Sequence, residues 1–129
     1  MRLRIGNEEA MKTSSYFAYR GPGRIGISMT VPDHLRNGLI MFTDLAPKIW
    51  FKGAEINVYH QHYFQMLSEL DPMVTWKKLH DLACGHEPVL LCWERPPFDE
   101  CNFCHRRLAA QWFENELGFI VPEWAAEEI

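Results

Sequence analysis

The sequence predicts an α/β protein, a single-domain layered fold with a small, mainly parallel sheet flanked by helices. Short apolar runs are interspersed with longer segments whose apolar residues recur every three or four positions. The predicted order is strand, strand, loop, helix, helix, strand, helix, strand, which is typical of α/β layers. The 129 residues suffice for one core. We expect residues 1–12 to be a loose lead-in and residues 13–129 to form one domain.

The first half of the chain predicts two strands and a long connection. Residues 13–21 are β-prone and lead into the turn signal RGPG. The apolar, β-branched run from Ile25 to Val31 stops at Pro32, which predicts a buried strand. Residues 33–53 are expected to be irregular, because Pro47 prevents a helix through their middle.

Two helices are expected next. Residues 56–70 carry apolar side chains at helical spacing, and we expect Tyr59 and Tyr63 to share a face and to lie in the core. The helix after it has Asp71 as a natural N-cap and Gly85 suited to its C-terminal cap.

The last part of the chain predicts a strand, a helix and a strand. The run from Val89 to Trp93 is apolar without alternation, which indicates a central strand covered on both faces. A helix is expected over residues 102–118, closed by Gly118, and a short strand follows that stops at Pro122.

Charge and composition exclude several classes of function. The net charge is -4, from 13 basic and 17 acidic residues, which argues against binding to a nucleic-acid backbone. There is no export signal and no apolar run that approaches a membrane span, so we expect a cytoplasmic protein without a membrane partner. The four cysteines are then interpreted as thiols or metal ligands in a reducing compartment.

Residues 92–112 hold the candidate site. Cys92, Trp93 and Glu94 end the predicted central strand, and Cys104 and the residues after it begin the next helix. Ligands of open α/β sheets bind outside the carboxyl ends of the strands. The free N–H groups of a helix N-terminus and the guanidinium of Arg106 favour an anion there.

Two other interpretations of this segment remain open. Cys92 and Cys104 are ordinary small core residues if Arg106 pairs structurally with Glu94. Alternatively, Cys101 and Cys104 form a C-x-x-C motif that His105 extends, which is compatible with zinc, although a second pair of ligands is missing.

The motifs VLLCWE, FCHRRLAAQW and VPEW resemble those of the domain-of-unknown-function family 488. TSSYFA, IGISMTVP and YHQHYFQMLSELDP are similar to its earlier segments, so the resemblance covers about residues 13–124. The sequence departs from the family pattern in its longer loop between Glu94 and Cys104, which also adds Cys101.

The resemblance implies a small α/β fold of cytoplasmic and phage-encoded proteins with no settled activity. The positions that match its motif are Cys92, Glu94, Cys104, His105 and Arg106. From the first strands, Tyr16 and Ser28 would join the same rim.

These observations together predict a pocket that binds a small anionic, nucleotide-like ligand at the carboxyl edge of the sheet. Arg106 would hold the anion, and the ligand would also contact Cys92, Trp93, Ser28 and Tyr16. Catalysis, if present, would use Glu94, Cys104 and His105, with no resident cofactor.

Two alternative functions stay open. One is a phage-type protein that sequesters a nucleotide immune signal, and the other is a protein-interaction module in which zinc is held by Cys101, Cys104 and His105. A homo-oligomer is also possible, because the adjacent Trp112 and Phe113 suggest that one of them faces outward.

Overall fold

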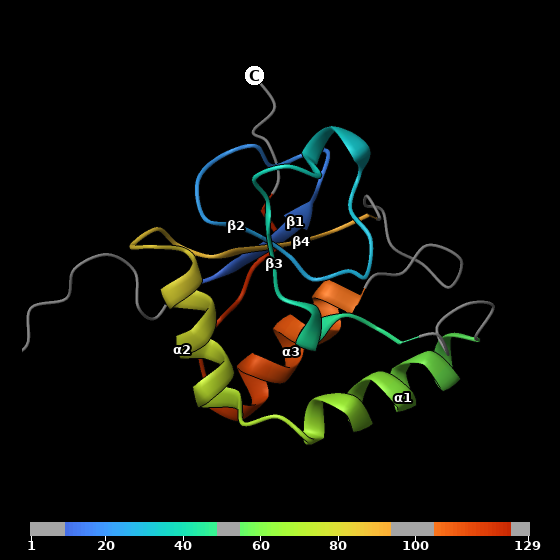
Figure 1. The fold of residues 1–129 in the computed structure, drawn as a ribbon. Helices are drawn as coiled ribbons and strands as arrows, with labels where there is room; N and C mark the ends of the chain where they lie inside the picture. Colours follow the sequence, from blue (N-terminus) through green and yellow to red (C-terminus); the bar gives the residue numbers. More distant parts are fainter. Residues whose placement is uncertain (1–9, 49–54, 94–104, 125–129) are drawn as a thin grey trace, which may run out of the picture.

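The computed structural model describes residues 10–48, 55–93 and 105–124, and within them it confirms the α/β class. The three α-helices gather on one side of a four-stranded sheet, and the connections between β1 and β3 cover the other side (Figure 1). In chain order the elements are β1 (Lys12–Ser15), β2 (Arg24–Gly26), the 3₁₀ helix η1 (Asp33–Leu35), β3 (Ile40–Met41), the 3₁₀ helix η2 (Thr43–Leu45), α1 (Ile56–Ser68), α2 (Pro72–Leu82), β4 (Val89–Cys92) and α3 (His105–Leu117).

The sheet has the order β1-β4-β2-β3, and all of its neighbouring strands are parallel. β4 is central, as its unbroken apolar run predicted, and all four of its residues are buried. Its last residue, Cys92, lies in register with Ser15 at the end of β1, and Leu91 lies in register with Gly26 at the end of β2. All carboxyl ends of the strands therefore meet at one edge.

The two faces of the sheet bury different side chains. Leu90 and Ile25 belong to the larger core with the helices, which includes the buried Tyr59 and Tyr63, as expected. Val89 and Leu91 point to the opposite face, where they pack with Tyr16 against the long connections. This alternation follows from the period of two along a strand.

The final predicted strand is reduced to a single bridge beside β1. Glu123 pairs in parallel with Thr13, whose N–H donates to Pro122 O at 3.0 Å. The N–H of Trp124 donates to Thr13 O at 2.7 Å. Pro122 has no N–H to extend the ladder, which explains why pairing stays this short. The bridge nevertheless places Glu123 beside β1.

The helix ends agree with the capping signals at Asp71 and Gly118, whereas the C-cap of α2 is Ala83 rather than Gly85. The N–H of Val74 donates to Asp71 Oδ1 at 3.0 Å, so Asp71 is the N-cap of α2. Gly118 follows α3 with a φ of 77°, and after the C-cap of α2 both Cys84, with a φ of 53°, and Gly85, with a φ of 91°, adopt positive values. These positive φ values suit glycine, which has no Cβ to clash.

Several expected boundaries were wrong. The strand expected to run to Val31 is shorter, because β2 ends at Gly26. Beyond it, the N–H of Ile27 still donates to Leu91 O, but Met29 and Thr30 are exposed. β3 lies in the connection that was expected to be irregular. The lead-in was also drawn too long, since Met11 is fully buried in the helix-side core and β1 begins at Lys12.

The outward aromatic residue expected on α3 was wrong as well. Trp112 is 6% exposed and Phe113 is fully buried. Both rings contribute to the core between α3 and its neighbours, so neither supports a self-association surface. Among the described residues, no helix combines the length and the apolar character needed to cross a membrane.

Candidate functional site

The carboxyl edge of the sheet holds the part of the predicted site that the structure describes. β4 ends there at Cys92, and the described part of α3 begins with His105 and Arg106. Glu94, Cys101 and Cys104 lie outside the described residues, so their predicted roles stay predictions.

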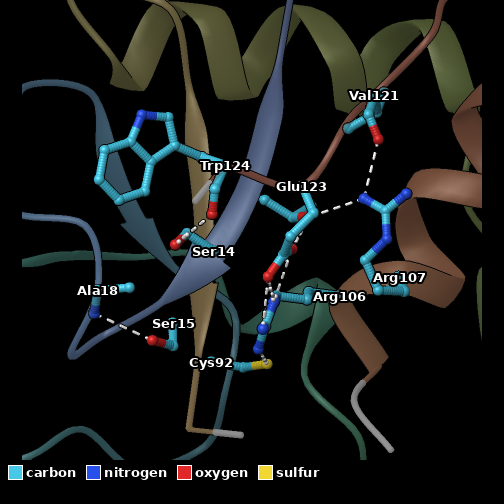
Figure 2. Close-up of polar contacts among 10 residues, drawn as sticks. Ser14, Ser15, Ala18, Cys92, Arg106, Arg107, Val121, Glu123 and Trp124 are labelled. Atoms are coloured by element: carbon cyan, nitrogen blue, oxygen red, sulfur yellow. Dashed lines mark hydrogen bonds and ion pairs between the residues drawn. The ribbon is translucent and has the colours of Figure 1, made fainter. Parts of the chain in front are cut away.

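Arg106 is the largest fully buried side chain of the described residues. Its Nε donates to Glu123 Oε1 at 3.0 Å and to Oε2 at 3.2 Å, and its Nη2 donates to Oε2 at 2.7 Å (Figure 2). This two-pronged ion pair neutralises most of the Arg106 charge, and the Glu123 side chain is itself only 21% exposed. Arg106 therefore does not present an open guanidinium to a ligand through these atoms.

The third nitrogen of the same guanidinium contacts the end of β4. Arg106 Nη1 donates to Cys92 Sγ at 3.0 Å. Cys92 is fully buried and disulfide-bonded, and its partner lies outside the described residues. The structure thus differs from the interpretation of Cys92 as a thiol, whereas Cys84 is free and exposed as expected of one.

Thr13 connects this ion pair to the next arginine along α3. Its hydroxyl donates to Glu123 Oε1 at 2.6 Å and accepts from Arg107 Nη1 at 2.8 Å. Arg107 Nη1 also donates to Val121 O at 2.9 Å. One partly buried network therefore runs from Arg107 through Thr13 and Glu123 to Arg106 and its sulfur contact; Figure 2 shows Glu123, Arg106 and Cys92 in it.

Arg107 differs from Arg106 in having no charged acceptor among the described residues. Arg107 is half-buried, and both of its acceptors are uncharged. Among the described residues, no carboxylate lies within ion-pair distance of its guanidinium. The positive charge of Arg107 therefore has no counter-charge among the described residues. A partly desolvated charge of this kind is costly without a counterion.

His105 is held in a neutral state by its surroundings. Its Nε2 lies 2.5 Å from Ile27 O, and since a carbonyl oxygen only accepts, Nε2 carries the proton. Burial lowers the pKa of His105 to about 4; the hydrogen bond to Ile27 raises it, and the Arg106 charge lowers it. The imidazole is neutral at pH 7, which fits a positioning role better than acid–base catalysis at that pH.

Tyr16, Ser28 and Trp93 form a second group on the loop-covered face. Ser28 Oγ donates to Thr30 O at 2.5 Å, so Tyr16 donates to Ser28 Oγ, also at 2.5 Å. Trp93 packs edge-on against Tyr16 with 5.9 Å between ring centroids, and its Nε1 donates to Thr30 O at 3.1 Å. Tyr16 and Ser28 are buried, whereas Trp93 remains 39% exposed.

The predicted residues therefore separate into two groups. Cys92 and Arg106 meet on the helix-covered side of the carboxyl edge, and Tyr16, Ser28 and Trp93 meet on the other side.

Sequence reasoning missed Thr13, Arg107 and Glu123. Only the adjacency of Arg107 to Arg106 and the presence of VPEW near the end of the chain pointed toward them. Glu123 reaches the site because the last segment pairs with β1.

Comparisons of the chain with models of protein families, with curated proteins and with solved structures find no match. The resemblance to family 488 accordingly stays a prediction that rests on the quoted motifs.

Proposed function

We propose that the protein binds a small anionic, nucleotide-like ligand near the carboxyl edge of its sheet, and that Arg107 holds the anion. The observation that carries this proposal is the half-buried guanidinium of Arg107, whose acceptors among the described residues, Thr13 Oγ1 and Val121 O, are both uncharged. A phosphate or carboxylate on Arg107 would supply the missing negative charge.

The assignment to Arg107 revises the predicted role of Arg106. Arg106 is fully buried and engaged by Glu123, so it serves to position that carboxylate and, through it, Thr13. Toward the described residues, Arg107 donates only through Nη1, and its Nε and Nη2 would be the donors for two oxygens of one anion.

An aromatic contact supports the nucleotide-like character of the proposed ligand. Trp93 follows the last residue of β4 and keeps 39% of its surface exposed although Tyr16 and Phe17 pack beside it. A half-exposed indole is suited to stack on a base. The Trp93 indole would be a second contact with the ligand. It lies at the end of β4 on the loop-covered face of the sheet, whereas the arginines lie on the helix-covered side.

A binding experiment with defined probes tests this proposal. Titration calorimetry with inorganic pyrophosphate, ATP and adenosine should show binding of the two anions and not of adenosine. R107Q should weaken both anions by about tenfold or more, because it removes the charge of the anchoring group. R36Q is the matched control, since Arg36 is exposed and pairs with Asp33 at 2.6 Å on the surface. Equal anion affinity in R107Q and R36Q would refute the role of Arg107.

The aromatic contact has its own test. W93L should weaken ATP by about tenfold and leave pyrophosphate unchanged, since only the nucleotide offers a base to stack. An equal loss for both probes would show that the substitution acts on the fold rather than on the base.

A turnover assay distinguishes an enzyme that acts on the nucleotide from a protein that only sequesters it. Release of product from a bound nucleotide would support an enzyme that uses the predicted Glu94 and Cys104. Stoichiometric binding without product would support a protein that sequesters a nucleotide, which is the phage-type alternative.

The zinc-stabilised module is tested by metal analysis. Among the described residues there is no group of three side chains that could hold a metal ion, and two of the proposed ligands, Cys101 and Cys104, lie outside them. About one zinc ion per purified chain would support the zinc-stabilised module, and a content far below one would exclude it.

A further inference from the structure

The turn between η1 and β3 contains the pair Asn37–Gly38, and we propose that this pair is a site of covalent self-modification at which Asn37 becomes an acidic residue in the folded protein. Arg36, Asn37 and Gly38 are all exposed, so water reaches the whole turn. The site is independent of ligand binding and follows from the exposure of the turn, the conformation of Gly38 and the hydrogen bonds around it.

Gly38 provides a nucleophile that no side chain shields. Its φ is 93°, a value that suits glycine, and a Cβ at this position would meet no described atom within 4 Å. Among the described residues, the Gly38 N–H donates no backbone hydrogen bond, whereas the Arg36 N–H donates to Asp33 O at 3.2 Å. The Gly38 nitrogen can therefore approach Cγ of the preceding Asn37.

The Asn37 amide is accessible to the same nitrogen. Its neighbours Arg36 and Asp33 pair with each other at 2.6 Å, and their side chains are 68% and 91% exposed. They form this pair on the surface without covering Asn37, which is itself exposed. Two groups that adjoin along the chain and meet without obstruction react as one molecule, which is far faster than a reaction between separate molecules.

The reaction proceeds in two steps. The Gly38 nitrogen loses its proton to solvent and attacks Asn37 Cγ. A bond forms between these two atoms, the bond from Cγ to the side-chain nitrogen breaks, and that nitrogen leaves as ammonia with a proton from solvent. Water then opens the resulting succinimide ring. Cleavage between Cγ and the Gly38 nitrogen gives aspartate, and cleavage between the main-chain carbonyl carbon and that nitrogen gives isoaspartate. The net reaction converts the amide and one water into a carboxylate and an ammonium ion.

Two other exposed asparagines lack this arrangement. Asn115 lies inside α3, where the helix holds the N–H of the residue after it in a hydrogen bond to the preceding turn. Asn57 lies in the first turn of α1 and is followed by Val58, whose branched side chain shields its nitrogen. Both serve as controls within the same molecule.

The test incubates the folded full chain in mildly alkaline buffer for several days and maps its peptides by mass spectrometry. The mass gain for replacing an amide by a carboxyl group should appear at Asn37 and not at Asn57 or Asn115. An enzyme that methylates isoaspartate should label the same peptide. G38A should slow the change by about tenfold or more, because the added methyl group obstructs ring closure. N37Q should remain unmodified there, because glutamine must close a larger ring.

A parallel incubation in urea separates the contribution of the fold from that of the sequence. The folded and unfolded chains should modify Asn37 at rates within about tenfold of each other, because the native turn leaves both reacting groups accessible. Modification of Asn37 in urea but not in the folded chain would overturn the proposal. Equal modification of Asn37 and Asn115 in the folded chain, or an unchanged rate in folded G38A, would also overturn it.

Discussion

Three consecutive side chains in the first described turn of α3 differ in burial, in charge and in their interaction partners. His105 is buried and neutral, Arg106 is buried and paired, and Arg107 is half-buried with no carboxylate partner in the described part of the chain. Successive residues of an α-helix point about 100° apart, so each meets a different neighbour. The sequence motif predicted an anion at Arg106, whereas the structure pairs Arg106 with Glu123, and the proposed function therefore places the anion at Arg107.

The burial of neutral His105 predicts how the free energy of unfolding depends on pH. Its folded pKa of about 4 lies below the ordinary value of 6.5, so the unfolded chain binds its proton first as the pH falls. The contribution is fully present above about pH 6.5 and is lost progressively toward pH 4. Between pH 7 and pH 5 the wild type should lose about 2 kcal/mol more than H105Q, measured by urea unfolding.

H105Q is the suitable comparison because an amide N–H still donates toward Ile27 O while the side chain no longer titrates. The carboxylates that also titrate in this range are common to both chains. An equal loss of stability in the two chains would show that His105 is not buried in its neutral form.

At the scale of elements, the helices were more predictable than the strands. α1 and α2 follow from apolar spacing over at least 11 residues and from local caps such as Asp71. β3 has two residues and β2 has three, too few to show a period. Their existence depends on neighbours already in place, since β2 pairs on both sides, with β4 and β3.

The N-cap of α2 supports a prediction at this scale. D71A removes the acceptor of the Val74 N–H and should lower the free energy of unfolding by about 1 kcal/mol. D81A is the matched control, because Asp81 is an exposed aspartate near the other end of the same helix. Its removal should change stability by less than about 0.5 kcal/mol. Urea unfolding of both variants checks this, and equal losses would contradict the capping role.

At the scale of the whole molecule, the Arg106–Glu123 pair joins α3 to the segment that follows it. Arg106 lies in the first described turn of α3, and Glu123 lies on the segment that pairs beside β1. Together with Thr13, the pair connects three separate parts of the chain at one edge of the sheet. Loss of one partner leaves the other charge buried without this ion pair, which is more costly than loss of both.

A double-mutant cycle measures this connection. R106M and E123M should each destabilise the chain, and the double variant should lose about 2 kcal/mol less than the sum of the two losses. The same cycle on Arg36 and Asp33, whose side chains are 68% and 91% exposed, should show almost no coupling. Additive losses at Arg106 and Glu123 would contradict a shared network.

The sequence by itself determined the α/β class, the positions of the helices, the burial of β4 and the placement of the start of α3 near the carboxyl edge. These features depend on local periodicity, on caps and on the order of elements, all of which can be read from neighbouring residues.

Only the tertiary structure decided which arginine is neutralised, that Tyr16 pairs with Ser28, and that Cys92 receives a hydrogen bond from Arg106. The charge state and burial of a polar side chain are set by whatever lies within a few ångströms of it. For Arg106 those neighbours, Cys92 and Glu123, are 14 and 17 residues away along the chain and arrive through the pairing of parallel strands.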